Sequence, residues 1–148
     1  MIRFAVAAIT LAMLIPATAQ AQPAPAAAPN PYACPPPDGV VAASYPNDLP
    51  DGMVALMTER FGTFATADQD FNMGDVVMPG RPDIRVDAIW HKGQHWAFIY
   101  EHGGRGRSVR LMAYDMGEDG QPKWVMEAPA PMNRVCAWTK DQLSHNGW

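Results

Sequence analysis

Residues 90–108, WHKGQHWAFIYEHGGRGRS, hold the side chains of this chain that are best suited to chemistry. Three histidines fall in this span, and His91 and His95 stand on either side of a predicted tight turn, with Glu101 a few residues further on. Histidines at a turn can approach each other, and imidazole is a good ligand for copper and zinc. The elements around these residues decide whether they form a site or only mark the corners of hairpins.

Patterns typical of enzymes are weak. The chain has no Gly-x-Ser-x-Gly motif, and none of its serines has a recognisable base beside it. Asp87 and Glu101 could form a glycosidase pair on adjacent strands, but nothing in the sequence shows that the pKa of either carboxyl group is raised or that a cleft exists. The GGRGR stretch joins two predicted strands, whereas a phosphate-binding loop runs from a strand into a helix and carries a lysine. We therefore expect no catalytic residue and no cofactor, and favour a binding protein over an enzyme.

The first 21 residues have the features of a secretory signal peptide. Arg3 precedes an apolar run from Phe4 to Ile15, and Ala19-Gln20-Ala21 forms a small-residue cleavage site. The run is too short to span a bilayer, and no later segment is apolar for long enough. We therefore expect a periplasmic or secreted bacterial protein with no integral membrane segment after cleavage. Residues 22–37 are a Pro/Ala-rich spacer, and residues 38–148 have the size of a single domain.

Charge and cysteine content narrow the class further. The formal net charge is −4, and it becomes −5 when Arg3 is lost with the signal peptide, which argues against nucleic acid as a partner. Cys34 and Cys136 are the only cysteines, and in an exported protein they are expected to form a disulfide. An intermolecular bridge or a catalytic thiol is less favoured, because neither cysteine stands in a Cys-x-x-Cys motif or next to a histidine.

Hydrophobic spacing predicts one helix followed by a meander. Apolar residues recur every three or four positions between Pro50 and Phe61, which predicts an amphipathic helix. Alternating segments predict strands at 85–91, 95–102, 107–115 and 123–128, with weaker strands at 75–78 and 135–138. Thr139 and Gln142 have capping-box spacing, which predicts a short helical turn near the end.

The strand registers are predicted by asking which pairing gathers apolar residues on one face. A three-residue turn at 91–93 sets Ala88 opposite Trp96, a four-residue loop at 103–106 sets Tyr100 opposite Val109, and a turn at Asp119-Gly120 sets Ala113 opposite Met126. The shared apolar face is Val86, Ala88, Trp90, Trp96, Phe98, Tyr100, Val109, Leu111, Ala113, Trp124, Met126 and Ala128. The predicted fold is therefore α+β, with one amphipathic helix packed across a four- to five-stranded antiparallel β-meander and one disulfide.

The opposite face is expected to stay open and amphipathic. One interpretation is a solvated face with charge pairs, such as Asp87 or Glu101 with Arg110. We favour a binding face for a protein, small-molecule or polysaccharide ligand of the cell envelope. A solvated sheet face would not need the strip of apolar residues that this face carries. Its residues, together with the basic loop, are Ile89, His95, Ala97, Ile99, Glu101, Arg105, Arg107, Arg110, Met112 and Tyr114. The alternative is a copper or zinc site formed by His91, His95 and Met112.

Two stretches resemble a pattern in small exported proteobacterial proteins. They are FNMGDVV at 71–77 and HWAFIYEHGGRG at 95–106, and the resemblance extends over the predicted helix and the first three strands. It implies a periplasmic or secreted location and brings no activity with it. The sequence thus predicts an exported, non-catalytic binding module.

Overall fold

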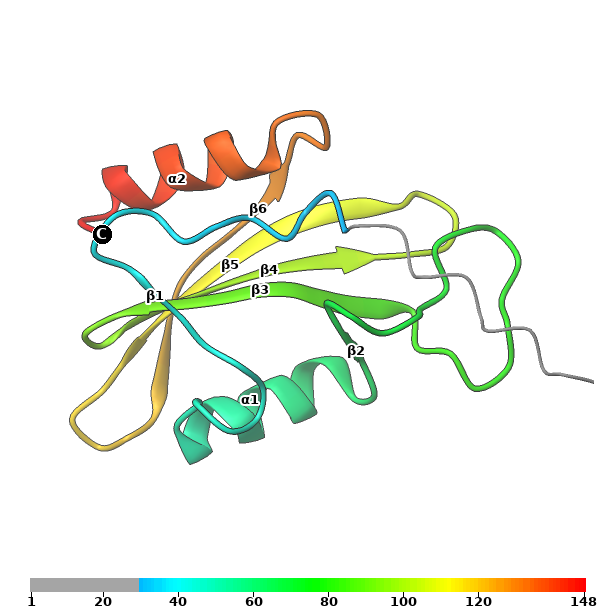
Figure 1. Cartoon of the computed structure of the whole chain (residues 1–148). Helices are drawn as coiled ribbons and strands as arrows, with labels where there is room; N and C mark the ends of the chain where they lie inside the picture. Colours follow the sequence, from blue (N-terminus) through cyan, green and yellow to red (C-terminus); the bar gives the residue numbers. More distant parts are fainter. Residues whose placement is uncertain (1–29) are drawn as a thin grey trace, which may run out of the picture.

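The predicted meander forms the centre of the structure, a computed structural model in which residues 30–148 are described (Figure 1). Four long antiparallel strands follow one another in sequence order: β3 (Ile84–Lys92), β4 (His95–His102), β5 (Ser108–Met116) and β6 (Pro122–Ala130). Two short strands both pair with the outer edge of β3: β1 (Val41–Ala42) is antiparallel to it and β2 (Ala65–Thr66) is parallel. The predicted α+β class, the meander and its four long strands are confirmed.

The predicted amphipathic helix is also confirmed, as α1 (Asp51–Phe61). Pro50 precedes its first turn, where a residue without a backbone N–H removes no helical hydrogen bond. Gly62 ends the helix at φ 62° and donates its N–H to the carbonyl of Thr58. Met53 and Met57 lie on the buried side of the helix, one turn apart.

The C-terminal segment differs from the prediction. A helix, α2 (Val135–His145), replaces both the predicted strand at 135–138 and the short turn after it. Val135, Thr139 and Leu143 are its buried residues, spaced by four so that they lie on one side of the helix. A four-residue apolar run does not distinguish a strand from a helix, and here the spacing of the residues that follow it decides.

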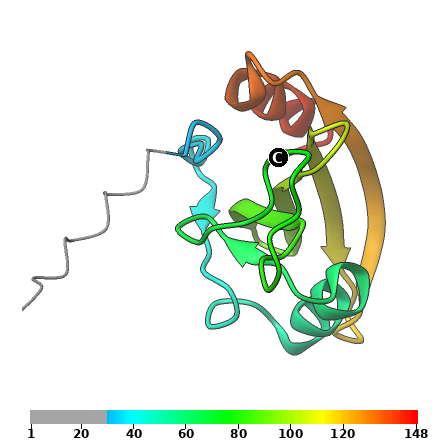
Figure 2. The same ribbon diagram turned by 90° about the vertical axis from the view of Figure 1, so that its right-hand side faces the viewer.

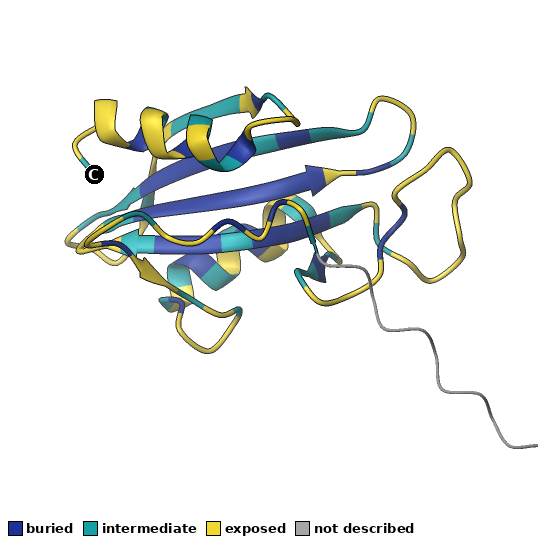
Figure 3. Cartoon of the chain, turned by 45° about the horizontal axis from the view of Figure 1, so that its top comes forward, coloured by how far each residue is buried: buried dark blue, intermediate teal, exposed yellow. Residues whose placement is uncertain are grey.

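Helix α2 and the N-terminal segment cover the face of the sheet that was expected to be open. Figures 1 and 2 show α1 on one side of the sheet and α2 on the other. Figure 3 shows that β3, β4 and β5 are largely buried between these layers. The core beneath α1 contains Leu49, Met53, Met57, Val86, Ile89, Trp96, Phe98, Tyr100, Met112 and Tyr114. The core beneath α2 contains Tyr32, Cys34, Val40, Trp90, Ala97, Ile99, Val109, Leu111, Ala130, Val135 and Leu143.

Two of the three predicted registers are wrong. Lys92 lies opposite His95, so the first turn has two residues rather than three. A β-bulge at Asp87 then shifts the register again, and Ala88 lies opposite Ile99 rather than Trp96. Tyr100 lies opposite Arg110 rather than Val109, a slip of one residue that moves side chains to the other face. The third register is confirmed as far as a second bulge, since Ala113 does face Met126.

The predicted disulfide between Cys34 and Cys136 is confirmed, with an S–S distance of 2.06 Å. It joins the N-terminal segment to α2, and Tyr32 and Cys34 are buried in the core that they share. Residues 30–37 therefore pack against the sheet, although they were expected to belong to the spacer. The predicted signal peptide and the earlier part of the spacer lie outside the described residues. Within residues 30–148 no helix combines the length and the apolar character that crossing a membrane requires.

Candidate functional site

The apolar residues of the predicted binding face do not lie on one surface. Ile89, Met112 and Tyr114 are buried beneath α1, whereas Ala97 and Ile99 are buried beneath α2. None of the five is more than 6% exposed. The prediction of an open amphipathic face is therefore wrong, because each face of the sheet is covered by a helix and its neighbouring segments.

The histidines proposed as metal ligands lie on opposite sides of the sheet. His91 stacks on Trp96, which belongs to the core beneath α1, with 4.7 Å between ring centroids. The Nδ1 atom of His95 lies 2.5 Å from a carboxylate oxygen of Asp115, and its ring packs near Trp148 on the α2 side. Met112 is enclosed beneath α1. The predicted ligand set is not assembled, and in the described part of the chain no three His, Cys, Asp or Glu side chains gather to hold a metal ion.

Glu101, Arg107 and their neighbours form an ionic cluster that is buried at Glu101 and partly exposed at Arg107. The Glu101 carboxylate is fully buried and accepts hydrogen bonds from Arg85, at 3.1 Å, and from Arg107. Arg85 also donates to Asp87 at 2.8 Å, and Asn30 donates to the same oxygen at 2.6 Å. Two arginines thus neutralise two carboxylates. Burial raises the pKa of Asp87 in spite of these partners, since desolvation disfavours its charged form.

Arg110 pairs with Glu127, not with Asp87 or Glu101 as one interpretation expected. Glu127 accepts hydrogen bonds from Arg110 at 2.6 Å, from the Tyr100 hydroxyl at 2.6 Å and from Arg60 of α1. Burial and the negative charge of Glu127 raise the pKa of Tyr100 to about 12. This cluster ties the C-terminal end of α1 to β5 and β6.

Four of the exposed large hydrophobic residues lie on one loop that precedes β3. Residues 72–82, here called the apolar loop, protrude beyond the sheet and are mostly exposed (Figure 3). Val76 is 79% exposed, Val77 66%, Met73 51% and Met78 48%. The weak strand predicted at 75–78 is wrong, since these residues form no strand. Their apolar side chains face solvent instead of a sheet.

A buried asparagine fixes the base of the apolar loop. The Asn72 amide donates to the carbonyl of Arg81 and to a carboxylate oxygen of Asp83, both at 2.8 Å, and its oxygen accepts the N–H of Met78 at 2.9 Å. Its backbone carbonyl accepts the N–H of Gly104. The side chain therefore uses three of its hydrogen-bonding positions to hold the loop closed.

The turn between β4 and β5 supports this base. A Cβ atom at Gly103 would collide with the backbone carbonyl oxygen of Asn72, so only glycine allows the two segments to approach this closely. Arg105 belongs to the same turn and is exposed, next to the base of the loop. Sequence reasoning assigned these glycines to a turn and did not connect them with the apolar loop.

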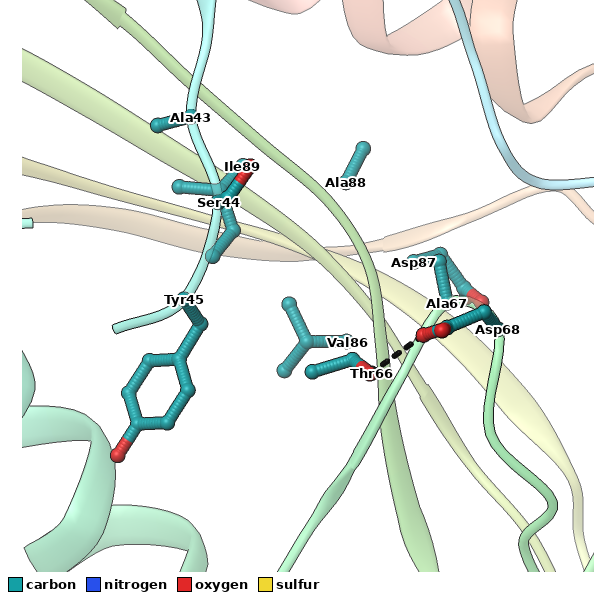
Figure 4. Close-up of a pocket in the computed structure, with 10 residues that line it drawn as sticks. All are labelled: Ala43, Ser44, Tyr45, Thr66, Ala67, Asp68, Val86, Asp87, Ala88 and Ile89. Atoms are coloured by element: carbon teal, nitrogen blue, oxygen red, sulfur yellow. Dashed lines mark hydrogen bonds between the residues drawn. The ribbon is translucent and has the colours of Figure 1, made fainter. Parts of the chain in front are cut away.

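A separate pocket of about 360 Å³ opens at the outer edge of β3 (Figure 4). This edge pocket is lined by Ala43, Ser44, Tyr45, Thr66, Ala67, Asp68, Val86, Asp87, Ala88 and Ile89. Most of its polar lining comes from segments that carry no recognisable motif, so only the tertiary structure brings these residues together.

Comparisons of this chain with protein-family models, with curated proteins and with solved structures find no match. The predicted resemblance to small exported proteobacterial proteins receives no support from them, and it stays a prediction.

Proposed function

We propose that this protein is a non-catalytic binding module of the bacterial cell envelope, and that it binds a partner protein through the apolar loop. One observation carries the proposal: four apolar side chains face solvent on a loop whose base is held by a buried asparagine. Contiguous exposed apolar patches on a folded protein mark interaction sites more often than solvated surface.

The loop is built so that little conformational freedom is lost on binding. Its ends are joined through Asn72 and Pro82, whose carbonyl accepts the Asn72 N–H at 2.9 Å. Binding through a preformed loop avoids part of the entropy cost that a flexible segment would incur. Covering the exposed parts of the four side chains would contribute about 1–2 kcal/mol each before the costs of association. That contribution suits a weak or transient interface.

The charges near the loop favour a protein over an anionic lipid surface. Asp75 is exposed among the apolar residues, and Asp70 pairs with Arg81 at 3.0 Å beside them. The whole chain carries a formal charge of −4, which would repel anionic headgroups. A protein with an apolar cleft and a basic side chain opposite Asp75 matches the loop in both respects.

Site-specific photo-crosslinking in cells tests the proposal. A photoreactive residue at position 77 should give one discrete covalent adduct, and Val76→Asp in the same chain should abolish it. Val41→Asp is the matched control, because Val41 is 55% exposed and lies on β1, away from the loop. Both changes should leave the melting temperature unaltered, since exposed substitutions cost little. An adduct that survives Val76→Asp, or binding of the purified protein to anionic vesicles, would refute the proposal.

A further inference from the structure

The edge pocket interrupts the pairing of the sheet. β1 pairs with the last part of β3 and β2 with its first part, so neither pairs with Asp87 or Ala88. The β-bulge of β3 falls at the same place. Bulges redirect side chains and occur often beside binding sites. Here the result is a recess whose two sides come from segments more than twenty residues apart.

One side of the pocket presents a carboxylate in a fixed position. The Thr66 hydroxyl donates to the Oδ1 atom of Asp68 at 2.7 Å, as the dashed line in Figure 4 shows. The Thr66 N–H donates to the side chain of Gln69, and the Gln69 N–H donates back to the Thr66 carbonyl, both at 2.9 Å. The hydrogen bond from Thr66 lowers the pKa of Asp68, so its carboxylate is anionic near neutral pH. This hydrogen bond uses Oδ1 and leaves Oδ2 available to accept another.

The other side is equally well ordered by local contacts. The Ser44 N–H donates to the Asp48 carboxylate at 2.9 Å, and the Asp48 N–H donates back to the Ser44 carbonyl at 3.0 Å. The Tyr45 ring packs edge-to-face on Phe64, with 4.8 Å between centroids. Tyr45 therefore forms a fixed aromatic wall.

An apolar floor lies between the two sides. Figure 4 shows Val86 between Tyr45 and Asp68, with Ile89 further along the same strand. Asp87 also lines the pocket; its Oδ1 atom accepts hydrogen bonds from Asn30 and Arg85, and its Oδ2 atom is buried without a hydrogen-bond partner among the described residues. Of the two carboxylates that line the pocket, that of Asp68 is exposed and that of Asp87 is buried.

From this arrangement we propose that the edge pocket binds a small organic cation, namely a primary ammonium or guanidinium group carried on a short apolar stem. The cationic head would donate to Asp68 Oδ2, and the stem would lie on Val86 against Tyr45. A charge-assisted hydrogen bond to a carboxylate is among the stronger polar contacts, and contact of the stem with Val86 and Tyr45 would remove apolar surface from water. The volume of about 360 Å³ lies at the lower end of the range for small-ligand pockets. This site is separate from the apolar loop, and its test is independent of the proposed function.

Titration of the oxidised, isotope-labelled protein with n-hexylammonium and n-butylguanidinium tests the proposal, with neutral 1-hexanol as the comparison. Two-dimensional NMR would follow the amide signals of residues 44–45 and 66–69, and the fit would give a Kd. We expect a Kd on the order of 1 mM for the cations, and binding at least about fivefold weaker for the alcohol.

Three variants separate charge from shape. Asp68→Asn should weaken cation binding at least about fivefold, and Ala67→Leu should do the same by filling the pocket without changing its charge. Glu59→Gln removes an exposed carboxylate from α1 outside the pocket and should leave the Kd unchanged. Circular dichroism would confirm that each variant is folded. Equal affinity in Asp68→Asn, signal shifts that map elsewhere, or no binding at concentrations on the order of 10 mM would overturn the proposal.

Discussion

Truncation of one buried residue on each side of the sheet tests whether both faces are covered. Ile99 is 1% exposed beneath α2, and Met112 is fully enclosed beneath α1. Replacing a buried isoleucine or methionine by alanine costs about 2–5 kcal/mol, because burial is lost and a cavity remains. Since both side chains are enclosed on all sides, we expect Ile99→Ala and Met112→Ala each to lower the free energy of unfolding by about 3–4 kcal/mol.

The double variant adds a test of geometry. The two side chains belong to separate cores on opposite faces, so their effects should add to about 7 kcal/mol with a coupling below about 0.5 kcal/mol. That loss is comparable with the whole stability of a typical domain, about 5–15 kcal/mol, so the double variant should be only marginally folded.

Urea unfolding of the oxidised protein, followed by tryptophan fluorescence and circular dichroism, would measure these energies. Val125→Ala is the control, because Val125 is one of the exposed hydrophobic residues and its truncation should change stability by less than about 0.5 kcal/mol. A loss below about 1 kcal/mol for Ile99→Ala or for Met112→Ala would mean that the corresponding face is open. The sheet would then not have a buried core on each of its faces.

Three further predictions concern the alkaline limit, the loop base and the disulfide. The pKa of Tyr100 is about 12 in the folded protein, against 10.0 for an unperturbed tyrosine. Because the unfolded chain loses this proton at lower pH than the folded protein does, the free energy of unfolding should fall by about 2–3 kcal/mol as the pH rises from 10 to 12. Urea unfolding at each pH should show that Tyr100→Phe removes this part of the slope, and an unchanged slope would contradict the role of burial and Glu127. Gly103→Ala should lower the free energy of unfolding by about 2 kcal/mol in the same assay and should speed proteolysis near Asn72. Unchanged resistance to proteolysis would show that the close approach of Gly103 to Asn72 is not needed. Cys136→Ser removes the disulfide, whose cysteines are 102 residues apart in sequence, and should lower the free energy of unfolding by about 4 kcal/mol. A loss of less than about 1 kcal/mol would contradict this prediction.

Local features of the chain determined much of the fold. Spacings of three and four residues predicted α1, and alternation between turn-forming pairs predicted the four long strands, because hydrophobic period and turn chemistry act over a few neighbouring residues. Two cysteines in a chain with a signal-like start predicted the disulfide that is present. The turn at Asp119-Gly120 also set the last register correctly as far as the bulge.

Which face each strand buries was decided only by the tertiary structure. The register argument assumed a single apolar face, but β4 reads WAFIY and is apolar on both, so a slip of one residue left the pattern acceptable. The bulge at Asp87 then offset the pairing, and local sequence gives no clear signal for it. The spacing by four of Val135, Thr139 and Leu143 was an indication that a second helix would cover the other face.

The candidate sites depend on contacts between segments that are distant in sequence. Four apolar residues among turn-formers could be read at 73–78, yet their exposure follows from the way Asn72 closes the loop against the β4–β5 turn. The edge pocket needs β1 and β2 to meet on one strand while leaving its bulge uncovered. The sequence by itself determined α1 and the four long strands, because their signals are local. The tertiary structure decided which side chains remain at the surface, because burial depends on what every other element covers.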